Sequence, residues 1–314
     1  MGLLGVIFLL GLGYLCSSNR KAISWRTVGG AFAIQVCFAV IVLATPWGKN
    51  ALQWLTLRVG EVVAAGDKGI RFVFGELADG GGGVGWIFAF KVLPVIIFFS
   101  SLIAVLYHLR VMQVVIRVVG GGLQKMLGTS RAESFSAAAN IFVGQTEAPL
   151  VIRPYLPRMT SSELFAVMVG GLASIAGSVL VGYSEMGARM DHLIAACFMA
   201  APGGLLFAKL LLPETEPPGV AQVDFAEGED RPVNVIDAAA LGAASGLKLA
   251  LNVGAMLLAF VGLIAVMNLL LGEVGSWFGH PGFSLQEVLG WVFAPVAYLI
   301  GVGGSEIQQA GSLI

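Results

Sequence analysis

Long apolar runs alternate with short polar stretches along this chain, and the runs are long enough to cross or nearly cross a lipid bilayer. A transmembrane helix needs about 20 mostly apolar residues. Six runs meet or approach that length: residues 2–16, 28–44, 92–109, 164–182, 192–212 and 249–271. Because the first run lacks the basic start of a cleavable signal peptide, we expect it to remain as a helix. The pattern predicts an all-α polytopic membrane protein.

Two other segments have helical periodicity but carry too many charges to cross the membrane. Residues 50–75 mix apolar side chains with five charged ones. Residues 110–127 place valines at helical spacing beside Arg110, Arg117 and Lys125. Segments of this kind are typical of amphipathic helices that lie in the membrane interface, and we expect both to do so.

Residues 134–156 are apolar enough to enter the bilayer, but Gly144 and the polar triplet Gln145, Thr146 and Glu147 divide them in half. Each half has about eleven residues, which as a helix would span ~16 Å, or about half of a 30 Å hydrocarbon core. We expect a re-entrant hairpin whose polar turn is buried in protein, because irregular backbone is not stable against lipid.

A second segment repeats this pattern near the end of the sequence. Val-Gly-Gly-Ser-Glu at residues 302–306 has the same form as Val-Gly-Gln-Thr-Glu at residues 143–147, and both interrupt apolar segments. Such a repeat is typical of transporters built from two related halves with a central site. Two spans follow the first copy but only eight residues follow the second. We therefore expect the sequence to be incomplete, with on the order of sixty or more residues and part of the site missing.

The run at residues 164–182 is unusually rich in small residues, including Gly170, Gly171, Ser174 and Gly177. Each glycine costs about 1 kcal/mol in a helix interior. Small residues permit close packing of neighbouring helices. Alternatively, the helix breaks near Ser174 and its freed carbonyl groups bind a cation.

The polar triplet has both a structural and a chemical interpretation. Thr146 suits the N-cap of a second half-helix and Glu147 suits its first turn. Capping explains neither Gln145 nor a carboxylate at membrane depth, which costs a few kcal/mol. A glutamine amide beside an acceptor-only glutamate suits a flat neutral solute with mixed donors and acceptors, such as a nucleobase. Asn140 could bind a hard cation through its carbonyl oxygen, or it could hydrogen-bond a neighbouring helix.

Composition and charge support this interpretation and exclude others. The chain is 57% hydrophobic and 12% charged, whereas soluble domains have about 25% charged residues. A formal charge of -1 provides no basic field for nucleic acid. The three cysteines and three histidines are scattered through the sequence, so we expect neither a disulfide framework nor a metal site built from them. The basic loop at residues 17–26 predicts a cytoplasmic position, which leaves the N-terminus outside.

Three motifs in this chain resemble those of the concentrative nucleoside transporter family, in the same order and along essentially the whole sequence. They are Gly-Gln-Thr-Glu-Ala-Pro-Leu at 144–150, Ala-Ser-Ile-Ala-Gly-Ser at 173–178 and Gln-Ala-Gly-Ser-Leu at 309–313. The resemblance implies a homotrimer whose scaffold helices surround mobile transport domains, each with two re-entrant hairpins and broken helices, moving in an elevator-like manner. The family's Asn-Glu-Phe motif and last helix, which complete the ribose site, are absent from this sequence.

The resemblance also implies roles for individual residues. The nucleobase would be bound by Gln145, Thr146 and Glu147. Sodium would be bound at the positions of Asn140, Val143, Ser174 and Ile175, with backbone carbonyl groups from Val143 and Ile175. The same match favours a helix break near Ser174.

From these observations we expect four parts in the chain. Residues 1–128 form scaffold and interfacial helices, and residues 129–212 form the first half of the transport domain. Residues 213–275 form a solvated, flexible cytoplasmic loop followed by a scaffold helix, and residues 276–314 form the second hairpin.

The resulting hypothesis is a symporter in a bacterial-type inner membrane that imports a uridine-like nucleoside with Na⁺ and uses no organic cofactor. Its partners would be the nucleoside, membrane lipid and two further copies of the chain. An enzyme is not expected, because the apolar core shows no Ser/His/Asp, Cys/His or metal-ligand pairing. Coupling to protons, or a passive channel or scaffold lined by the hairpins, are the alternatives.

Overall fold

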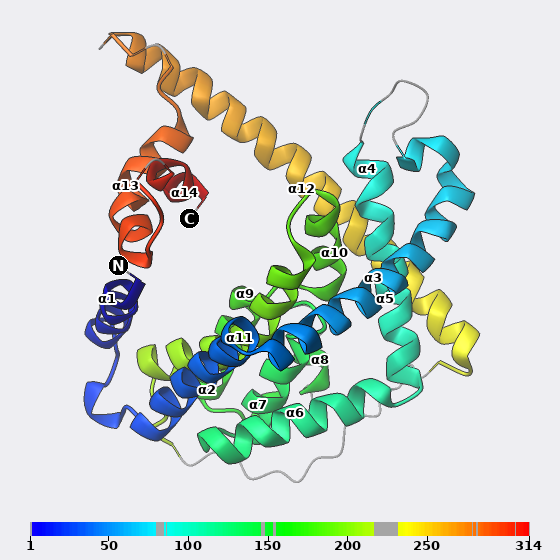
Figure 1. Cartoon of the computed structure of the whole chain (residues 1–314), viewed down its shortest axis with the longest axis horizontal. Coiled ribbons are helices and arrows are strands. Elements are labelled where there is room, and N and C mark those ends of the chain that lie inside the picture. Colours follow the sequence, from blue (N-terminus) through cyan, green and yellow to red (C-terminus); the bar gives the residue numbers. More distant parts are fainter. Residues whose placement is uncertain are drawn as a thin grey trace. The chain divides into compact units, whose positions relative to one another are not determined.

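A computed structural model describes residues 2–79, 85, 87–145, 148–152, 155–216, 232–277, 279–280, 282–304 and 306–313. The described residues form helices joined by turns and short loops, without a β-strand among them (Figure 1). The longer helices are α1 (Gly2–Leu15), α2 (Trp25–Ala44), α3 (Pro46–Phe74), α5 (Leu93–His108), α6 (Val111–Leu127), α7 (Arg131–Ala139), α9 (Ser161–Ala173), α10 (Gly177–Glu185), α11 (Met190–Leu211), α12 (Val235–Trp277), α13 (Leu285–Ile300) and α14 (Ile307–Leu313). The short helices α4 (Phe88–Lys91) and α8 (Ala148–Val151) complete the α-helices. The all-α prediction is confirmed.

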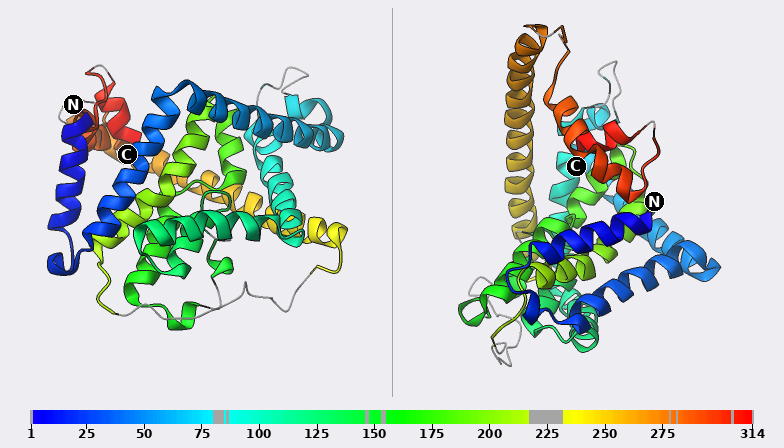
Figure 2. Two further views of the ribbon diagram at one scale, coloured as in Figure 1. Left: turned by 60° about the horizontal axis from the view of Figure 1, so that its bottom comes forward. Right: turned by 90° about the vertical axis from the view of Figure 1, so that its left-hand side faces the viewer.

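The chain divides into two compact units. One unit comprises Met1–Cys16 and Asn252–Ile314, and the other comprises Ser17–Leu251. In the first unit, α1 packs on α13 where Gly5 meets the backbone of Leu299. Also in this unit, α13 and α14 lie side by side in all views (Figures 1 and 2). The second unit contains α7 and the polar motif that follows it, and is described below.

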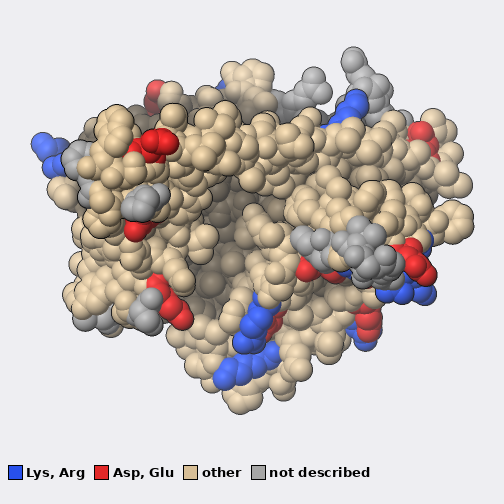
Figure 3. Space-filling model, turned by 90° about the horizontal axis from the view of Figure 1, so that it is seen from above, with Lys and Arg blue, Asp and Glu red and all other residues tan. Residues whose placement is uncertain are grey.

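Four described helices are long and apolar enough to cross a membrane. They are Trp25–Ala44, the combined stretch Phe88–His108, Met190–Leu211 and Val235–Trp277. In the view of Figure 3, uncharged residues cover most of the visible surface, and acidic and basic residues form small separate groups. The chain is therefore a multi-pass membrane protein, as the hydrophobic pattern predicts.

The helix α12 is much longer than the span expected at residues 249–271. It has 43 residues, which at 1.5 Å per residue makes it about 64 Å long, roughly twice the thickness of a hydrocarbon core. Its additional N-terminal turns are rich in Ala and Gly rather than in large apolar residues, so a span predicted from hydropathy alone begins too late. Gly242 and Gly246 pack there against α5 around Ser100, and Ser101 donates a 2.9 Å hydrogen bond to the carbonyl of Ala239.

The two amphipathic segments are helical, as expected. The first, α3, begins at Pro46, directly after the N-cap Thr45. This start is four residues earlier than the predicted start at residue 50. In α6, Met112, Ile116, Gly120 and Leu123 are buried on one face. Val114 and Val118 lie on the exposed face of the same helix. These two valines therefore do not contribute to the core of their unit.

The run at residues 164–182 is not one continuous helix. The first half, α9, ends at Ala173 and α10 begins at Gly177, so residues 174–176, here called the helix break, have non-helical backbone. Ser174 and Ala176 are extended, with ψ of 156° and 137°. The glycines also serve close packing, because a Cβ at Gly204 on α11 would come within 3.1 Å of the Gly170 Cα. Close helix packing and a helix break therefore both occur in this run.

Candidate functional site

The helix α7 leads into the first polar turn and is almost wholly enclosed by protein. Ser130 caps it by accepting a 3.3 Å hydrogen bond from the backbone N–H of Glu133. The helix sequence Arg-Ala-Glu-Ser-Phe-Ser-Ala-Ala-Ala contains few large side chains, and every residue from Ala132 to Ala139 is buried. A helix of such small residues allows its neighbours to approach closely.

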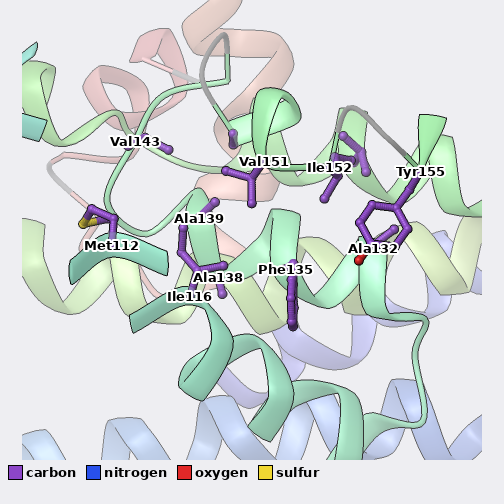
Figure 4. Packing of buried hydrophobic residues seen from close by; sticks show 12 residues of the cluster. Met112, Ile116, Ala132, Phe135, Ala138, Ala139, Val143, Val151, Ile152 and Tyr155 are labelled. Atoms are coloured by element: carbon purple, nitrogen blue, oxygen red, sulfur yellow. The ribbon is translucent and has the colours of Figure 1, made fainter. Parts of the chain in front are cut away.

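Two neighbouring helical segments cover this helix with an apolar cluster. Met112 and Ile116 on α6 lie beside Ala138 and Ala139, and Val151 and Ile152 approach from the other side of the turn (Figure 4). Ile116 and Ile152 have no exposed surface. The burial of this cluster stabilises the packing of α7 against its neighbours.

Residues 140–145 follow α7 and are here called the α7 turn. In this turn the N–H groups of Phe142 and Val143 both donate hydrogen bonds of 2.9 Å to the carbonyl of Ala139. A helical segment does follow the turn, but it is shorter than the eleven residues expected: α8 has four residues and ends at Val151. Prolines at positions 149, 154 and 157 deprive the backbone of amide donors here, which a count of apolar residues overlooks.

The α7 turn packs directly against α9 and the helix break. A Cβ on Gly170 would lie 3.2 Å from the Asn140 Nδ2, and a Cβ on Gly171 would lie 2.9 Å from the Gln145 Cβ. The Phe142 carbonyl oxygen is only 2.5 Å from the position that a Cβ on Gly177 would take. These glycines allow an approach that larger residues would block. The structure thus brings together the segments that carry Asn140, Val143, Ser174 and Ile175.

Asn140 has an unpaired acceptor at this junction. The residue is 2% exposed, and its Oδ1 has no hydrogen-bond partner among the residues that the structure describes. One alternative for Asn140 was a hydrogen bond to a neighbouring helix. Its Oδ1 makes no such bond to the described residues. An unsatisfied buried acceptor costs about 1–3 kcal/mol. A hard cation or an ordered water would relieve this cost.

The helix break supplies further oxygen atoms close by. The Ser174 hydroxyl makes only a long 3.4 Å hydrogen bond to the Gly171 carbonyl. The Ile175 carbonyl accepts a weak 3.9 Å contact from the Cys197 thiol. Val143 is buried within the turn. Neutral amide, hydroxyl and carbonyl oxygens are ligands that suit a hard cation, so these residues fit Na⁺ in type.

The residues expected to bind the base are only partly visible. Gln145 lies at the exposed end of the α7 turn, against Gly171. Thr146 and Glu147 lie outside the described residues. Within the part of the chain that the structure describes, no group of three or more His, Cys, Asp or Glu residues is arranged to hold a metal ion.

The second copy of the motif also sits in a turn between two helices. The helix α13 ends at Gly301, whose φ of 100° is left-handed, and α14 begins directly after Glu306. A Cβ on Gly290 would lie 2.8 Å from the Gln308 carbonyl oxygen, so α13 and α14 approach closely. The motif at residues 302–306 therefore lies between two helices that pack together.

One cluster of buried polar side chains, around Lys209, was not predicted from the sequence. Lys209 on α11 is 5% exposed, and its Nζ lies 2.9 Å from the Glu133 Oε1. The same Nζ donates to the Ser162 Oγ at 2.8 Å and to the Glu214 Oε2 at 3.3 Å. Glu214 begins the linker that was expected to be flexible, so its first residues are held in place. A lone lysine within the apolar run at residues 192–212 was the available signal, because intramembrane charges are costly unless paired.

Comparisons with known proteins agree with this arrangement. Three family models match successive parts of the chain: the Na+ dependent nucleoside transporter N-terminus over residues 4–77, nucleoside recognition over residues 89–190, and the Na+ dependent nucleoside transporter C-terminus over residues 192–314. An uncharacterized transporter of Haemophilus influenzae is 59% identical over 99% of this chain and 75% of its own length. The nucleoside permease NupC of Helicobacter pylori is 50% identical over 99% of this chain and 74% of its own length.

A solved structure shares the fold as well. CNTnw in an inward-facing, substrate-bound state matches with a TM-score of 0.93 and 57% sequence identity, over 99% of this chain and 74% of that one. Identity at this level over nearly the whole chain identifies a family and not only a fold. The chain therefore belongs to the concentrative nucleoside transporter family, the Na⁺-dependent nucleoside transporters.

Proposed function

We propose that this protein is a symporter that carries a nucleoside across the membrane together with Na⁺. The observation that carries the proposal is the contact between the α7 turn and the helix break, with the unpaired buried Oδ1 of Asn140 beside it. Membership of a Na⁺-dependent family supports sodium as the coupling ion.

In this proposal Na⁺ binds to the oxygen atoms of Asn140, Val143, Ser174 and Ile175. The side chains of Asn140 and Ser174 and the backbone carbonyl groups of Val143 and Ile175 would replace its water shell. Support comes from the Asn140 Oδ1, which is unpaired among the described residues, from the non-helical backbone at residues 174–176 and from the long 3.9 Å contact of the Cys197 thiol with the Ile175 carbonyl. In this proposal Na⁺ is transported as well as bound, because it crosses the membrane together with the nucleoside.

The nucleobase would bind to Gln145, Thr146 and Glu147. Gln145 is exposed and ends the turn that begins with Asn140, so one short segment carries residues for both the ion and the base. A cation that orders this turn would also position Gln145, which raises the affinity for nucleoside. By thermodynamic linkage, the nucleoside must raise the affinity for Na⁺ by the same factor. This reciprocity provides a physical basis for coupling.

The two helix–turn–helix segments are proposed as re-entrant hairpins of a transport domain. Residues 1–128 would provide the scaffold, residues 129–212 and 276–314 would provide parts of the moving domain, and residues 213–275 would connect them. The complete protein would act as a homotrimer in the inner membrane, with its N-terminus outside and an elevator-like movement of each transport domain. The basic loop at residues 17–26 supports this orientation.

The test is uridine uptake into vesicles that contain the purified protein, with and without an inward Na⁺ gradient. We expect accumulation that requires Na⁺, and a half-saturating uridine concentration that falls as Na⁺ rises. Equal uptake driven by a proton gradient alone would disprove sodium coupling. Uptake that only equilibrates and does not saturate would instead support a passive channel, and no uptake of any nucleoside would disprove the substrate class.

A further inference from the structure

The cluster around Lys209 joins three segments that are distant in the sequence. An ammonium group has three N–H donors, and this one has an acceptor for each: Glu133 on α7, Ser162 in the first turn of α9, and Glu214 after the end of α11. Ser162 in turn donates a 2.6 Å hydrogen bond to the Leu212 carbonyl. The lysine is therefore fully satisfied although it is buried.

The neighbouring carboxylates add directional contacts at the same end of α9. Thr160 caps this helix in a reciprocal arrangement with Glu163, and its hydroxyl donates a 2.8 Å hydrogen bond to the Glu214 Oε2. Charge-assisted hydrogen bonds such as these are short and roughly twice as strong as neutral ones. They fix the axial position of the helices that they join.

The two helices joined by Lys209 also meet at their other ends, at the candidate site. Glu133 precedes Asn140 by seven residues, a helical rise of about 10 Å, and Ser162 precedes Gly170 by eight residues, a rise of about 12 Å. Asn140 and Gly170 are in contact. The helices α7 and α9 consequently run side by side in the same direction from the Lys209 cluster to the site.

Apolar packing alone defines the register of α7 and α9 poorly. On the α9 side the residues at the junction are small, because Gly170 meets Asn140 and Gly171 meets Gln145. Small faces allow close approach but present few projections to stop one helix from sliding along the other. A directional contact at the base is therefore the element that sets how far the α7 turn reaches along α9.

We propose that Lys209 is a positioning residue that sets the register of the α7 turn against the helix break. It touches neither ion nor substrate, and it acts through Glu133 and Ser162 on the far ends of the two helices. The consequence for Na⁺ affinity rests on the proposed function, whereas the consequence for the order of the turn does not.

The test compares hydrogen exchange of the purified full chain with that of a charge-neutral variant, Glu133→Gln combined with Lys209→Met. Removing both charges avoids a buried unpaired carboxylate. We expect amides at residues 140–145 and 174–177 to exchange about tenfold faster, the factor expected for losing hydrogen bonds to a charged group. Amides of α13 and α14 should be unchanged. Exchange at the wild-type rate in the turn of the folded double variant would overturn the proposal.

Two further variants keep the test sharp. Lys91→Met is the matched control, because Lys91 also bridges two carboxylates, Asp67 and Glu185, each at 3.4 Å, but contacts neither α7 nor α9. It should leave hydrogen exchange at residues 140–145 unchanged, and an increase equal to that of the double variant would overturn the proposal.

Glu214→Gln is a milder change, which replaces one acceptor oxygen of the carboxylate. If the double variant does not fold, this variant should raise hydrogen exchange at residues 140–145 about threefold. No increase would again overturn it.

Uptake separates this proposal from the proposed function. In vesicles, the double variant should need about tenfold more Na⁺ for half-maximal uridine uptake while its rate at saturating Na⁺ is retained. If uridine uptake by the wild-type protein did not depend on Na⁺, sodium symport would be disproved. The hydrogen-exchange result would then decide the role of Lys209 by itself. A fall in maximal rate with unchanged Na⁺ affinity would contradict a positioning role.

Discussion

Lys209 Nζ lies 2.9 Å from Glu133 Oε1, and both side chains are almost completely buried. Lys209→Met should therefore lower the free energy of unfolding by about 3–5 kcal/mol, because it leaves a buried carboxylate without its partner. Adding Glu133→Gln should restore most of that loss. Thermal unfolding in one detergent measures both effects, and a single variant as stable as wild type would contradict the pairing.

Gly177→Ala should weaken sodium dependence. The new Cβ would come within 2.5 Å of the Phe142 carbonyl oxygen, so the turn or the helix break must shift. We expect the half-saturating Na⁺ concentration for uridine uptake to rise about tenfold, since small displacements in a binding site cost this much or more. Gly69→Ala is the matched control, because a Cβ there meets nothing within 4 Å. Equal Na⁺ dependence in the two variants would argue against an ion site at this junction.

Glu147→Gln should abolish uridine uptake while the protein still forms its oligomer. The carboxylate can only accept hydrogen bonds, and a glutamine presents a donor to the same group of the base. Radiolabelled uptake together with size-exclusion chromatography separates lost transport from lost assembly. Glu61→Gln removes an exposed carboxylate paired with Arg58 on α3 and should transport normally. Retained transport in Glu147→Gln would reduce Glu147 to a role in capping.

Gly290→Ala should loosen the second hairpin. A Cβ at this position would lie 2.8 Å from the Gln308 carbonyl oxygen, so α13 and α14 must separate or distort at a cost of about 1–3 kcal/mol. Hydrogen exchange of α14 should become faster, while that of α9 should not change. Gly282→Ala introduces a Cβ into open space and is the matched control. Protection of α14 that matches wild type would show that the hairpin tolerates a wider spacing.

Local sequence signals were sufficient to predict which segments are helical. The pattern of apolar runs located α2, α5 and α11, and the crowding of small residues marked the break between α9 and α10. Asn140 and Ser174 could be paired from the resemblance alone, and the structure places their segments in contact. The helices and the break could be predicted because each depends on residues that are close together in the chain.

Features that depend on distant segments could not be predicted in this way. The cluster at Lys209 forms only after three helices have packed, when it is joined by Glu133, Ser162 and Glu214. No spacing of residues in the sequence predicts this cluster. The extent of α12 was underestimated because its alanine-rich beginning is helical without being strongly apolar. The length of α8 was overestimated because apolar composition was given more weight than the prolines.

The helix break at residues 174–176 has an implication for how this protein tolerates change. The oxygen that Ile175 offers belongs to the main chain, and every amino acid possesses the same atom. Replacing Ile175 with a residue of similar size would leave that chemistry intact. A survey of point variants would consequently find more severe losses at the flanking glycines, whose missing side chains make room for the junction, than at Ile175.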